Sequence, residues 1–374
     1  MIQIGTLKET KFKENRVALS PDVVTELQKK GFNIHIESDA GTAAGYTDAM
    51  YQHAGATLTS ADDILKQVDI LLQVNAPHLD VIAKLKPKAV LISFMYGATH
   101  PELIAACCAA GISAFSMDAV PRISRAQKMD ALSSQANLAG YKAVLMAADC
   151  LGKIFPMMTT AAGTIKPSKV VIFGAGVAGL QAIATAKRLG AVVEVSDIRP
   201  ETKEQVESLG AKYISVKHDD AVKTEGGYVK DLSADFLKRQ HELLAKHVTE
   251  ADVVITTALI PGKKAPLLVT EDMLNGMRPG SVVVDMAAEQ GGNVFGTQLN
   301  ETILRNGVTI IGESNLPALL PKNASALYAK NIATLVLHLA NGDGMRWEME
   351  EDITKGALLV YEGKAVHPTV IKNN

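Results

Sequence analysis

Short apolar runs alternate with segments of helical periodicity along the first third of the chain. The runs that we interpret as strands are Ile2–Leu7, Asn33–Ser38, Asp69–Val74, Ala89–Met95 and Ile112–Ser116. Apolar residues at helical spacing lie between them, as in Pro21–Lys30 and Pro101–Ala110. Strands that alternate with helices are typical of βαβ units, so this pattern predicts a parallel α/β sheet.

The alternation returns after a long helical stretch, 130–151, and a segment that contains proline and glycine, 155–167. The strands predicted in this second region are Lys169–Phe173, Val192–Asp197, Ala211–Val216, Asp252–Thr256, Ser281–Met286 and Val308–Ile311. The helices predicted between them are Val177–Leu189, Pro200–Leu209 and Ser233–His247. This order of elements is typical of a doubly wound nucleotide-binding fold.

The end of the chain is expected to return to the first domain. A helix is predicted over Ala324–Leu339, and a short mixed tail over Ala357–Ile371. We therefore expect an α/β protein of two Rossmann-like, doubly wound parallel-sheet domains. The first comprises residues 1–130 with 322–374, and the second comprises residues 131–321. A length of 374 residues also favours two domains over one.

Composition argues against several classes of function. The net charge of −2 and the aromatic content of 5% are unlike those of a nucleic-acid binder. The best apolar stretch, 138–151, is interrupted by Lys142 and Asp149, so no membrane-spanning helix is predicted. The N-terminus lacks the basic segment of a signal peptide. Three cysteines and nine histidines lack metal-ligand spacing, so no metal site is expected and the cysteines are interpreted as reduced thiols.

A glycine-rich turn follows the predicted strand Lys169–Phe173 and opens the next helix. Its six residues, which match GxGxxG, are Gly174, Ala175, Gly176, Val177, Ala178 and Gly179. In this context the first glycine permits a tight turn, the second lets a pyrophosphate approach, and the third lets the helix pack on the sheet. The helix N-terminus then faces the phosphates with its free N–H groups. The alternative is a strand–helix turn that binds no ligand.

A carboxylate ends the second strand of this unit. Asp197 lies 18 residues after Gly179 and is followed by Ile198 and Arg199. A carboxylate here accepts hydrogen bonds from the adenosine ribose and repels a 2′-phosphate, which favours NAD(H) over NADP(H). Arg199 weakens this preference slightly, because a guanidinium can accommodate a phosphate. Ala258, Leu259 and Glu289 follow later strands and can also border the cofactor; for Glu289 a purely structural role stays equally open.

Polar residues are concentrated between the two predicted domains, in Pro121–Gln135. Ligands of such proteins bind at the carboxyl ends of strands, often in a cleft between domains. A nicotinamide carboxamide needs both a donor and an acceptor, which Arg122, Gln127 and Asp130 can supply. The alternative is a solvated linker followed by a helix that Asp130 or Ser133 caps. The residues alone do not decide between these two interpretations.

At this point the sequence resembles a known family. Ser124–Tyr141, SRAQKMDALSSQANLAGY, is similar to the signature of the NAD(H)-binding component of proton-translocating transhydrogenases. Four further runs resemble the same family: FPMMTTAAGT (Phe155–Thr164), GLQAIATAKRLG (Gly179–Gly190), TKEQVESLG (Thr202–Gly210) and ITTALIPGKKAP (Ile255–Pro266). The resemblance covers nearly the whole chain.

The resemblance implies direct hydride transfer from NADH to NADP⁺ on a partner subunit, coupled to proton translocation. It implies a homodimer in the cytoplasm, held at the inner face of the membrane by NADP(H)-binding and membrane-spanning subunits. The nicotinamide loop of the family falls on Arg122, Gln127 and Asp130, with Ser133 beside them. A mobile lid falls on the polar insert that contains Gly227, with Tyr228 as its aromatic tip, and Gln240 is implied near the ribose. The alternative for Tyr228 is an ordinary exposed tyrosine.

Alanine dehydrogenases share much of this sequence and supply a second hypothesis. Their substrate-binding Arg matches Arg16, but the Lys and His that they also need fall on Asn75 and Tyr96. Deamination needs general acid–base groups, whereas hydride transfer between two nicotinamides needs contact geometry without a proton relay. Arg16 is therefore interpreted mainly as a structural residue that bonds a carbonyl or carboxylate. A third hypothesis is a non-catalytic NAD(H) sensor.

Overall fold

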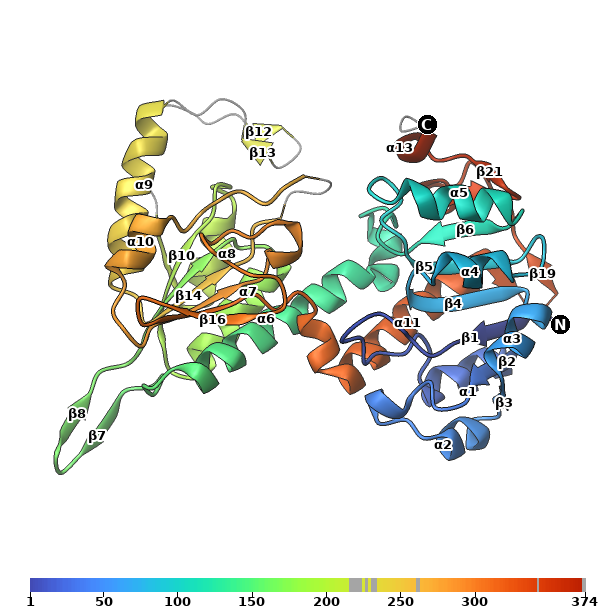
Figure 1. Ribbon diagram of the computed structural model, residues 1–374, viewed down its shortest axis with the longest axis horizontal. Coiled ribbons are helices and arrows are strands. Elements are labelled where there is room, and N and C mark those ends of the chain that lie inside the picture. The colour runs from blue at the N-terminus through green and yellow to red at the C-terminus, as the bar shows by residue number, and fades with distance from the viewer. Residues whose placement is uncertain (215–223, 226–227, 230–233, 260–262, 342, 372–374) are drawn as a thin grey trace. The chain divides into compact units, whose positions relative to one another are not determined.

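The computed structural model describes residues 1–214, 224–225, 228–229, 234–259, 263–341 and 343–371. The chain divides into two compact units (Figure 1). Unit 1 comprises Met1–Gln135 and Pro317–Asn374, and unit 2 comprises Ala136–Leu316. The boundary falls inside one helix, α6 (Ala131–Cys150), so this helix begins in unit 1 and ends in unit 2.

Unit 1 is built on an eight-stranded sheet in the order β21-β20-β6-β5-β4-β1-β2-β3. Its strands are β1 (Gln3–Thr6), β2 (Asn33–Glu37), β3 (Thr57–Thr59), β4 (Ile70–Asn75), β5 (Val90–Phe94), β6 (Ser113–Ser116), β20 (Leu358–Tyr361) and β21 (Lys364–Ala365). The strands from β1 to β6 pair in parallel, as predicted. β20 pairs antiparallel with β6, and β21 pairs antiparallel with β20, so the carboxyl-terminal tail extends this sheet.

Alternating side chains give the unit 1 sheet two buried faces. On β4, Ile70 and Leu72 belong to one apolar cluster, and Leu71 between them belongs to another. The helices of the first cluster are α1 (Pro21–Lys29), α2 (Asp48–His53) and α11 (Pro321–Leu339). Those of the second are α3 (Ala61–Gln67), α4 (Leu79–Ala83) and α5 (Pro101–Ala109). Helices on both faces of a parallel sheet define the doubly wound architecture.

Unit 2 has a seven-stranded sheet in the order β11-β10-β9-β14-β15-β17-β16. Its strands are β9 (Lys169–Phe173), β10 (Val192–Ser196), β11 (Lys212–Tyr213), β14 (Val253–Thr256), β15 (Val282–Asp285), β16 (Thr302–Arg305) and β17 (Val308–Ile311). All pair in parallel except β16, which adds an antiparallel edge. Its helices are α7 (Val177–Arg188), α8 (Thr202–Ser208), α9 (Ala234–Thr249) and α10 (Glu271–Gly276). The α/β fold with two Rossmann-like units is therefore confirmed.

Some predicted bounds were wrong. The strand expected over Ala211–Val216 is limited to β11 among the described residues, and α8 begins at Thr202 rather than Pro200. The segment 155–167 is more than a connection, because β7 (Met158–Thr160) and β8 (Gly163–Ile165) form an antiparallel hairpin in it. Residues 156–166 are all exposed, and the hairpin projects from unit 2 (Figure 1).

Candidate functional site

The phosphate loop, Gly174–Gly179, connects β9 to α7 in unit 2. Gly174 has a φ of +98°, and a Cβ placed there would lie 2.4 Å from Oγ1 of Thr257. A Cβ on Gly179 would lie 1.9 Å from the carbonyl oxygen of Gly174. Both glycines are therefore required by the protein's own backbone, since no side chain fits at either position.

Gly176 differs from the other two glycines. A Cβ placed there meets only Nη2 of Arg199, 4.0 Å away, so the protein leaves the space beside it open. The helix α7 starts at the next residue, and the first four N–H groups of a helix have no partner within the helix. Open space beside unpaired donors at a positive helix end fits a pyrophosphate, which is the group that the sequence predicted for this loop.

Asp197 lies at the end of β10 with its side chain only 4% exposed. Its Oδ2 accepts the N–H of Ala175 at 2.6 Å, and its Oδ1 accepts the N–H of Arg199 at 2.8 Å. The Arg199 guanidinium completes a two-point ion pair, with Nε 3.0 Å from Oδ1 and Nη2 2.9 Å from Oδ2. Burial would raise the pKa of Asp197, but these hydrogen bonds and the Arg199 charge outweigh burial and lower it. The carboxylate is thus ionised and bonded to the phosphate loop.

Apolar side chains are exposed at the same ends of the strands. Val177, Ile198 and Leu259 are 40%, 53% and 49% exposed, although they adjoin buried strands. Exposed apolar surface beside a phosphate-binding loop can cover the flat faces of a nucleoside. Glu289 lies in a short 3-10 helix, Ala288–Gln290, directly after β15, and is also exposed.

Thr257 and Ala258 link β14 to the phosphate loop. The sequence did not predict this supporting role. Oγ1 of Thr257 donates to the carbonyl of Phe173 at 3.1 Å and lies 3.4 Å from that of Gly174. Ala258 is held in turn by the side chain of Asn293. The sequence shows only that Thr257 is a polar residue at the end of a buried strand. Its contacts with Phe173 and Gly174 join residues more than 80 positions apart, so the sequence did not reveal them.

In unit 1, the segment 121–135 contains a 3-10 helix, Ser124–Met129, that leads into α6. Ala126 and Met129 are buried, and Nδ2 of Asn331 on α11 donates to the carbonyl of Lys128 at 2.8 Å. Arg122 and Gln127 are exposed. This pattern fixes the backbone of the segment while the two polar side chains face outward.

Asp130 caps the helix α6. Its Oδ1 accepts the N–H of Ser133 at 2.9 Å, and its Oδ2 accepts the Ser133 hydroxyl at 2.6 Å. The capping interpretation is therefore confirmed for Asp130. The Asp130 carboxylate can accept further hydrogen bonds, because a carboxylate offers about four acceptor positions and Ser133 uses two of them.

The predicted lid lies largely outside the described residues. Tyr228 lies in a two-residue strand, β13 (Tyr228–Val229), opposite β12 (Thr224–Glu225), and Glu225 is its cross-strand partner. Gly227 is outside the described residues, and so is the side chain of Gln240, whose backbone belongs to α9.

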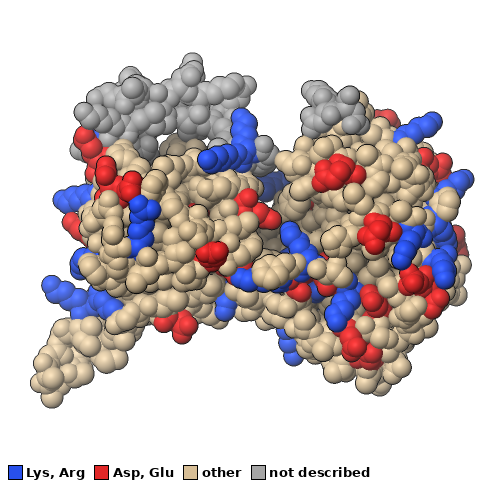
Figure 2. All heavy atoms as spheres, in the orientation of Figure 1, with Lys and Arg blue, Asp and Glu red and all other residues tan. Residues whose placement is uncertain are grey.

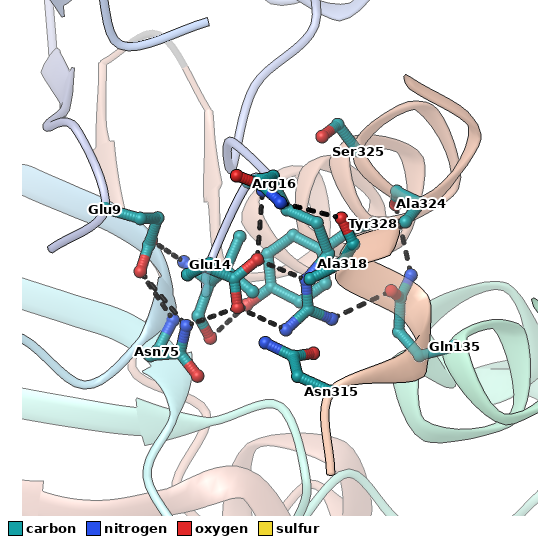
Figure 3. A network of polar contacts seen from close by, with 12 residues as sticks. Glu9, Glu14, Arg16, Asn75, Gln135, Asn315, Ala318, Ala324, Ser325 and Tyr328 are labelled. Carbon is teal, nitrogen blue, oxygen red and sulfur yellow. Dashed lines mark hydrogen bonds and ion pairs between the residues drawn. The ribbon is translucent and has the colours of Figure 1, made fainter. Parts of the chain in front are cut away.

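Arg16 is buried in a polar network within unit 1 (Figure 3). Its Nε and Nη2 bind the two oxygens of Glu14 at 2.7 and 2.6 Å. Its Nη1 donates to Oε1 of Gln135 at 2.9 Å. Burial would raise the pKa of Glu14, but the hydrogen bonds and charge of Arg16 lower it to about 2. The geometry is that of a structural arginine whose carboxylate partner is supplied by the chain itself.

Asn75 joins a second carboxylate to this network. Its Nδ2 lies 2.9 Å from Oε2 of Glu14 and 3.1 Å from Oε2 of Glu9 (Figure 3). Oε1 of Glu9 accepts the N–H of Val74 at 2.6 Å. Burial and the charge of Glu14 raise the pKa of Glu9 to about 7. Neither carboxylate was identified from the sequence, because the Glu9–Asn75 contact spans 66 residues.

Tyr96 occupies a strained turn after β5, with a φ of +47°. Its N–H donates to Oδ1 of Asp118 at 3.1 Å, and its ring stacks on Phe94 with centroids 5.9 Å apart. The side chain of Asn75 is an amide, which does not titrate. Asn75 and Tyr96 are the two positions at which the sequence lacks the Lys and His expected of an alanine dehydrogenase.

Two further properties of the described residues bear on function. Among them, no group of histidine, cysteine, aspartate and glutamate side chains has the geometry to hold a metal ion. No helix in the described ranges combines the length and the apolar character needed to cross a membrane. Basic and acidic side chains are interspersed on the face shown in Figure 2.

The sequence of this chain matches the models of two protein-family domains. Residues 5–139 match the model described as alanine dehydrogenase/PNT, N-terminal domain, and residues 143–368 match the corresponding C-terminal domain. The chain belongs to the alanine dehydrogenase/PNT family. The phosphate loop and Asp197 lie in the second of these family domains, and Arg16 and Asn75 lie in the first.

Within this family the chain is more similar to transhydrogenases than to alanine dehydrogenases. It is 44% identical, over 99% of both chains, to the first portion of NAD(P) transhydrogenase subunit alpha from Rhodospirillum rubrum. The crystal structure of transhydrogenase from Sinorhizobium meliloti has a TM-score of 0.86 and 42% identity, covering 98% of this chain and 99% of that one. A solved L-alanine dehydrogenase has a TM-score of 0.84 but 29% identity, covering 99% of this chain and 98% of that one. The resemblance inferred from the sequence is thus confirmed.

Proposed function

We propose that this chain is the NAD(H)-binding component of a proton-translocating NAD(P) transhydrogenase, which passes hydride from NADH to NADP⁺ held by a partner subunit. The observation that carries the proposal is the 44% identity over 99% of both chains to a transhydrogenase alpha-subunit polypeptide. The phosphate loop supports it independently, because the space beside Gly176 is open where the protein itself does not require a glycine. A redox role also follows from the dehydrogenase-type fold of the solved relatives.

The residues fit NAD(H). The pyrophosphate lies against the phosphate loop, and the adenosine ribose lies near Asp197, Ile198 and Arg199. The negative charge of Asp197 disfavours a 2′-phosphate, so this chain takes NAD(H) while the partner subunit takes NADP(H). Ala258 and Leu259 border the bound dinucleotide, Gln240 contacts a ribose, and Gly227 and Tyr228 belong to a lid that closes over it.

The nicotinamide lies against the segment 121–135. Arg122 and Gln127 hold the carboxamide, and Asp130 accepts from its amide while Ser133 holds the Asp130 carboxylate in place. Hydride passes from C4 of one nicotinamide to C4 of the other, which consumes NADH and NADP⁺ and yields NAD⁺ and NADPH. The step needs the two rings at contact distance, with water excluded, and releases no proton at the reacting carbon.

The assembly is a homodimer that binds membrane-spanning and NADP(H)-binding subunits from the cytoplasmic side of the membrane. The name "subunit alpha" of the relatives supports a complex of several subunits. The hairpin β7–β8 supports the homodimer, because Met157, Met158 and Ile165 are 66%, 45% and 44% exposed on an arm with no neighbouring strand among the described residues. An isolated two-stranded hairpin is marginally stable in water, so a second chain is a suitable partner. Light scattering should show a dimer for the natural chain and a monomer for the Met158→Asp/Ile165→Lys variant.

The test of the reaction uses the purified chain, an NADP(H)-binding transhydrogenase domain, NADPH and the acetylpyridine analogue of NAD⁺. Reduction of the analogue is followed by absorbance. We expect turnover only when both proteins are present. Absence of turnover, with both proteins folded and both nucleotides bound, would contradict the reaction and favour an NAD(H) sensor.

An alanine dehydrogenase-type activity is the second candidate, because the solved L-alanine dehydrogenase shares the fold with a TM-score of 0.84. The contacts of Asn75 with Glu9 and Glu14, and of Arg16 with Glu14, count against it. NADH oxidation in the presence of pyruvate and ammonia tests it directly. Appreciable turnover in this assay would favour the second candidate over the first.

A further inference from the structure

Asn293 is a fully buried amide that uses its side chain to hold another part of the backbone. It lies in the loop after β15 and is 0% exposed. Its Oδ1 accepts the N–H of Ala258 at 3.1 Å, and its Nδ2 donates to the carbonyl of the same residue at 3.0 Å. The Asn293 amide therefore pairs with both polar groups of one residue, as a neighbouring strand would.

The same amide also anchors a second point. Nδ2 of Asn293 donates to the carbonyl of Pro266 at 2.8 Å. Ala258 and Pro266 lie on either side of the connection that follows β14, so one side chain fixes both places. The backbone carbonyl of Asn293 holds the same connection at two more points, because it accepts the N–H groups of Leu268 at 2.7 Å and Val269 at 3.0 Å.

The loop that carries Asn293 is held by hydrogen bonds to Asp285. Asp285, at the end of β15, is 0% exposed and accepts four hydrogen bonds. The donors are the hydroxyls of Thr256 and Thr297 and the N–H groups of Ala287 and Val294. These four hydrogen bonds tie the loop to β14 and β15, because each lost contact would leave a buried polar atom without a partner.

Ala258 is next to the residue that supports the phosphate loop. Thr257 donates from its N–H at 2.9 Å and from its Oγ1 at 3.1 Å to the carbonyl of Phe173, the last residue of β9. Its Oγ1 also lies 3.4 Å from the carbonyl of Gly174. A continuous set of contacts thus runs from Asn293 through Ala258 and Thr257 to Gly174.

We infer that Asn293 is a positioning residue of the dinucleotide site, which sets the Thr257–Ala258 backbone against the phosphate loop from the side opposite Asp197. The inference rests on the proposed NAD(H)-binding function. Asn293 acts through Ala258 and Thr257, and its effect falls on the affinity for the dinucleotide. Asp197 holds Ala175 from the β10 side, so the loop is supported from both neighbouring strands.

The test compares Asn293→Ala with Ser168→Ala in the full chain. Ser168 is also 0% exposed, and its hydroxyl donates to the carbonyl of Ile154 at 2.8 Å, but it precedes β9 at the end far from the phosphate loop. NADH affinity is measured by the nucleotide's fluorescence and stability by thermal unfolding. We expect the Asn293→Ala change to raise the NADH Kd about tenfold, and the ADP-ribose Kd equally, whereas Ser168→Ala leaves both within about twofold.

Equal NADH affinity for Asn293→Ala and the natural chain would overturn the inference, and so would an equal loss in the two variants. The proposed function is judged separately, by NADH binding to the natural chain. Thr257→Val, which keeps the side-chain shape and removes the hydroxyl, is a second variant along the same contacts and should also raise the NADH Kd. If Asn293→Ala does not fold, an unchanged NADH Kd in Thr257→Val overturns the inference by itself.

Discussion

Oδ2 of Asp197 lies 2.6 Å from the backbone nitrogen of Ala175, so the carboxylate that ends β10 is bonded to the phosphate loop that follows β9. Three N–H groups of Arg199 take the other acceptor positions of this carboxylate. A carboxylate has about four such positions, and the protein fills them. A ribose hydroxyl can therefore bind Asp197 only if it shares or displaces the Arg199 guanidinium.

This relationship gives the first prediction. Asp197→Ala should raise the NADH Kd about tenfold, because the loop loses its bond at Ala175 as well as the ribose acceptor. The same change should improve NADPH binding relative to NADH, since Arg199 is then free to meet a 2′-phosphate. Binding of both nucleotides is measured by fluorescence titration. In the double variant Asp197→Ala/Arg199→Ala the gain for NADPH should disappear; unchanged selectivity in the single variant would show that the ribose binds elsewhere.

The second prediction is that Gly176 and Gly179 of the phosphate loop have different roles, the first in NADH binding and the second in stability. Gly176→Ala should fold with a loss of no more than about 1 kcal/mol, the cost of alanine at a helix N-cap. It should nevertheless weaken NADH binding more than about tenfold, because the methyl group fills the space for the pyrophosphate. Gly179→Ala should cost about 3 kcal/mol by overpacking, since its Cβ would lie 1.9 Å from the Gly174 carbonyl. Urea unfolding and NADH titration give both quantities; normal NADH binding by Gly176→Ala contradicts the proposed cradle.

The sequence predicted the buried strands well because their apolar runs are long and continuous. β9 and β17 have the predicted bounds. β3 and β16 were missed because they are short edge strands without a buried residue, and their conformation depends on hydrogen bonds to β2 and β17. Neither strand contains the long apolar run from which the central strands were predicted.

The residues of the candidate site also fall into two groups, those that the sequence predicted and those that only the structure revealed. The glycines of the phosphate loop and Asp197 follow one another at short spacing, so their pattern is visible in the sequence. The Asn293–Ala258 contact spans 35 residues and the Glu9–Asn75 contact spans 66. Contacts of this kind arise from the order of strands in the sheet, which residue spacing does not encode.

The third prediction concerns Gln127, which is exposed on the 3-10 helix of unit 1. Gln127→Asn keeps the amide but draws it back by one methylene, so the ring is held in a poorer orientation. Hydride transfer to the partner's nucleotide should slow by about 10- to 100-fold, while the NADH Kd changes little. Stopped-flow transfer rates and NADH titration provide the two numbers. Lys128→Gln, an exposed neighbour on the same helix, is the control, and an equal fall in rate and affinity for Gln127→Asn contradicts its orienting role.

The last prediction uses the two carboxylates that share the amide of Asn75. Burial and the charge of Glu14 raise the pKa of Glu9 from 4.5 to about 7 in the folded chain. The folded state therefore binds the extra proton between these values, and the stability that Glu9 contributes is lost as pH rises from about 5 through 7. The stability that Glu14 contributes changes with pH in the opposite direction. Its pKa is lowered to about 2, so its contribution is lost only as pH falls below 4.5.

Glu9→Gln removes the proton site and keeps a neutral polar side chain, so it should flatten the fall in stability between pH 5 and 8. One proton contributes a slope of up to about 1.4 kcal/mol per pH unit, which is well within the resolution of urea unfolding. Glu26→Gln, an exposed position on α1 of the same unit, serves as the matched control and should keep the natural slope. The NADH Kd should be the same in both variants, since Glu9 contacts Val74 and Asn75 rather than the nucleotide-binding loop. Identical pH profiles for Glu9→Gln and the natural chain would mean that Glu9 is ionised in the folded protein and that its burial is offset by the donors of Asn75 and Val74.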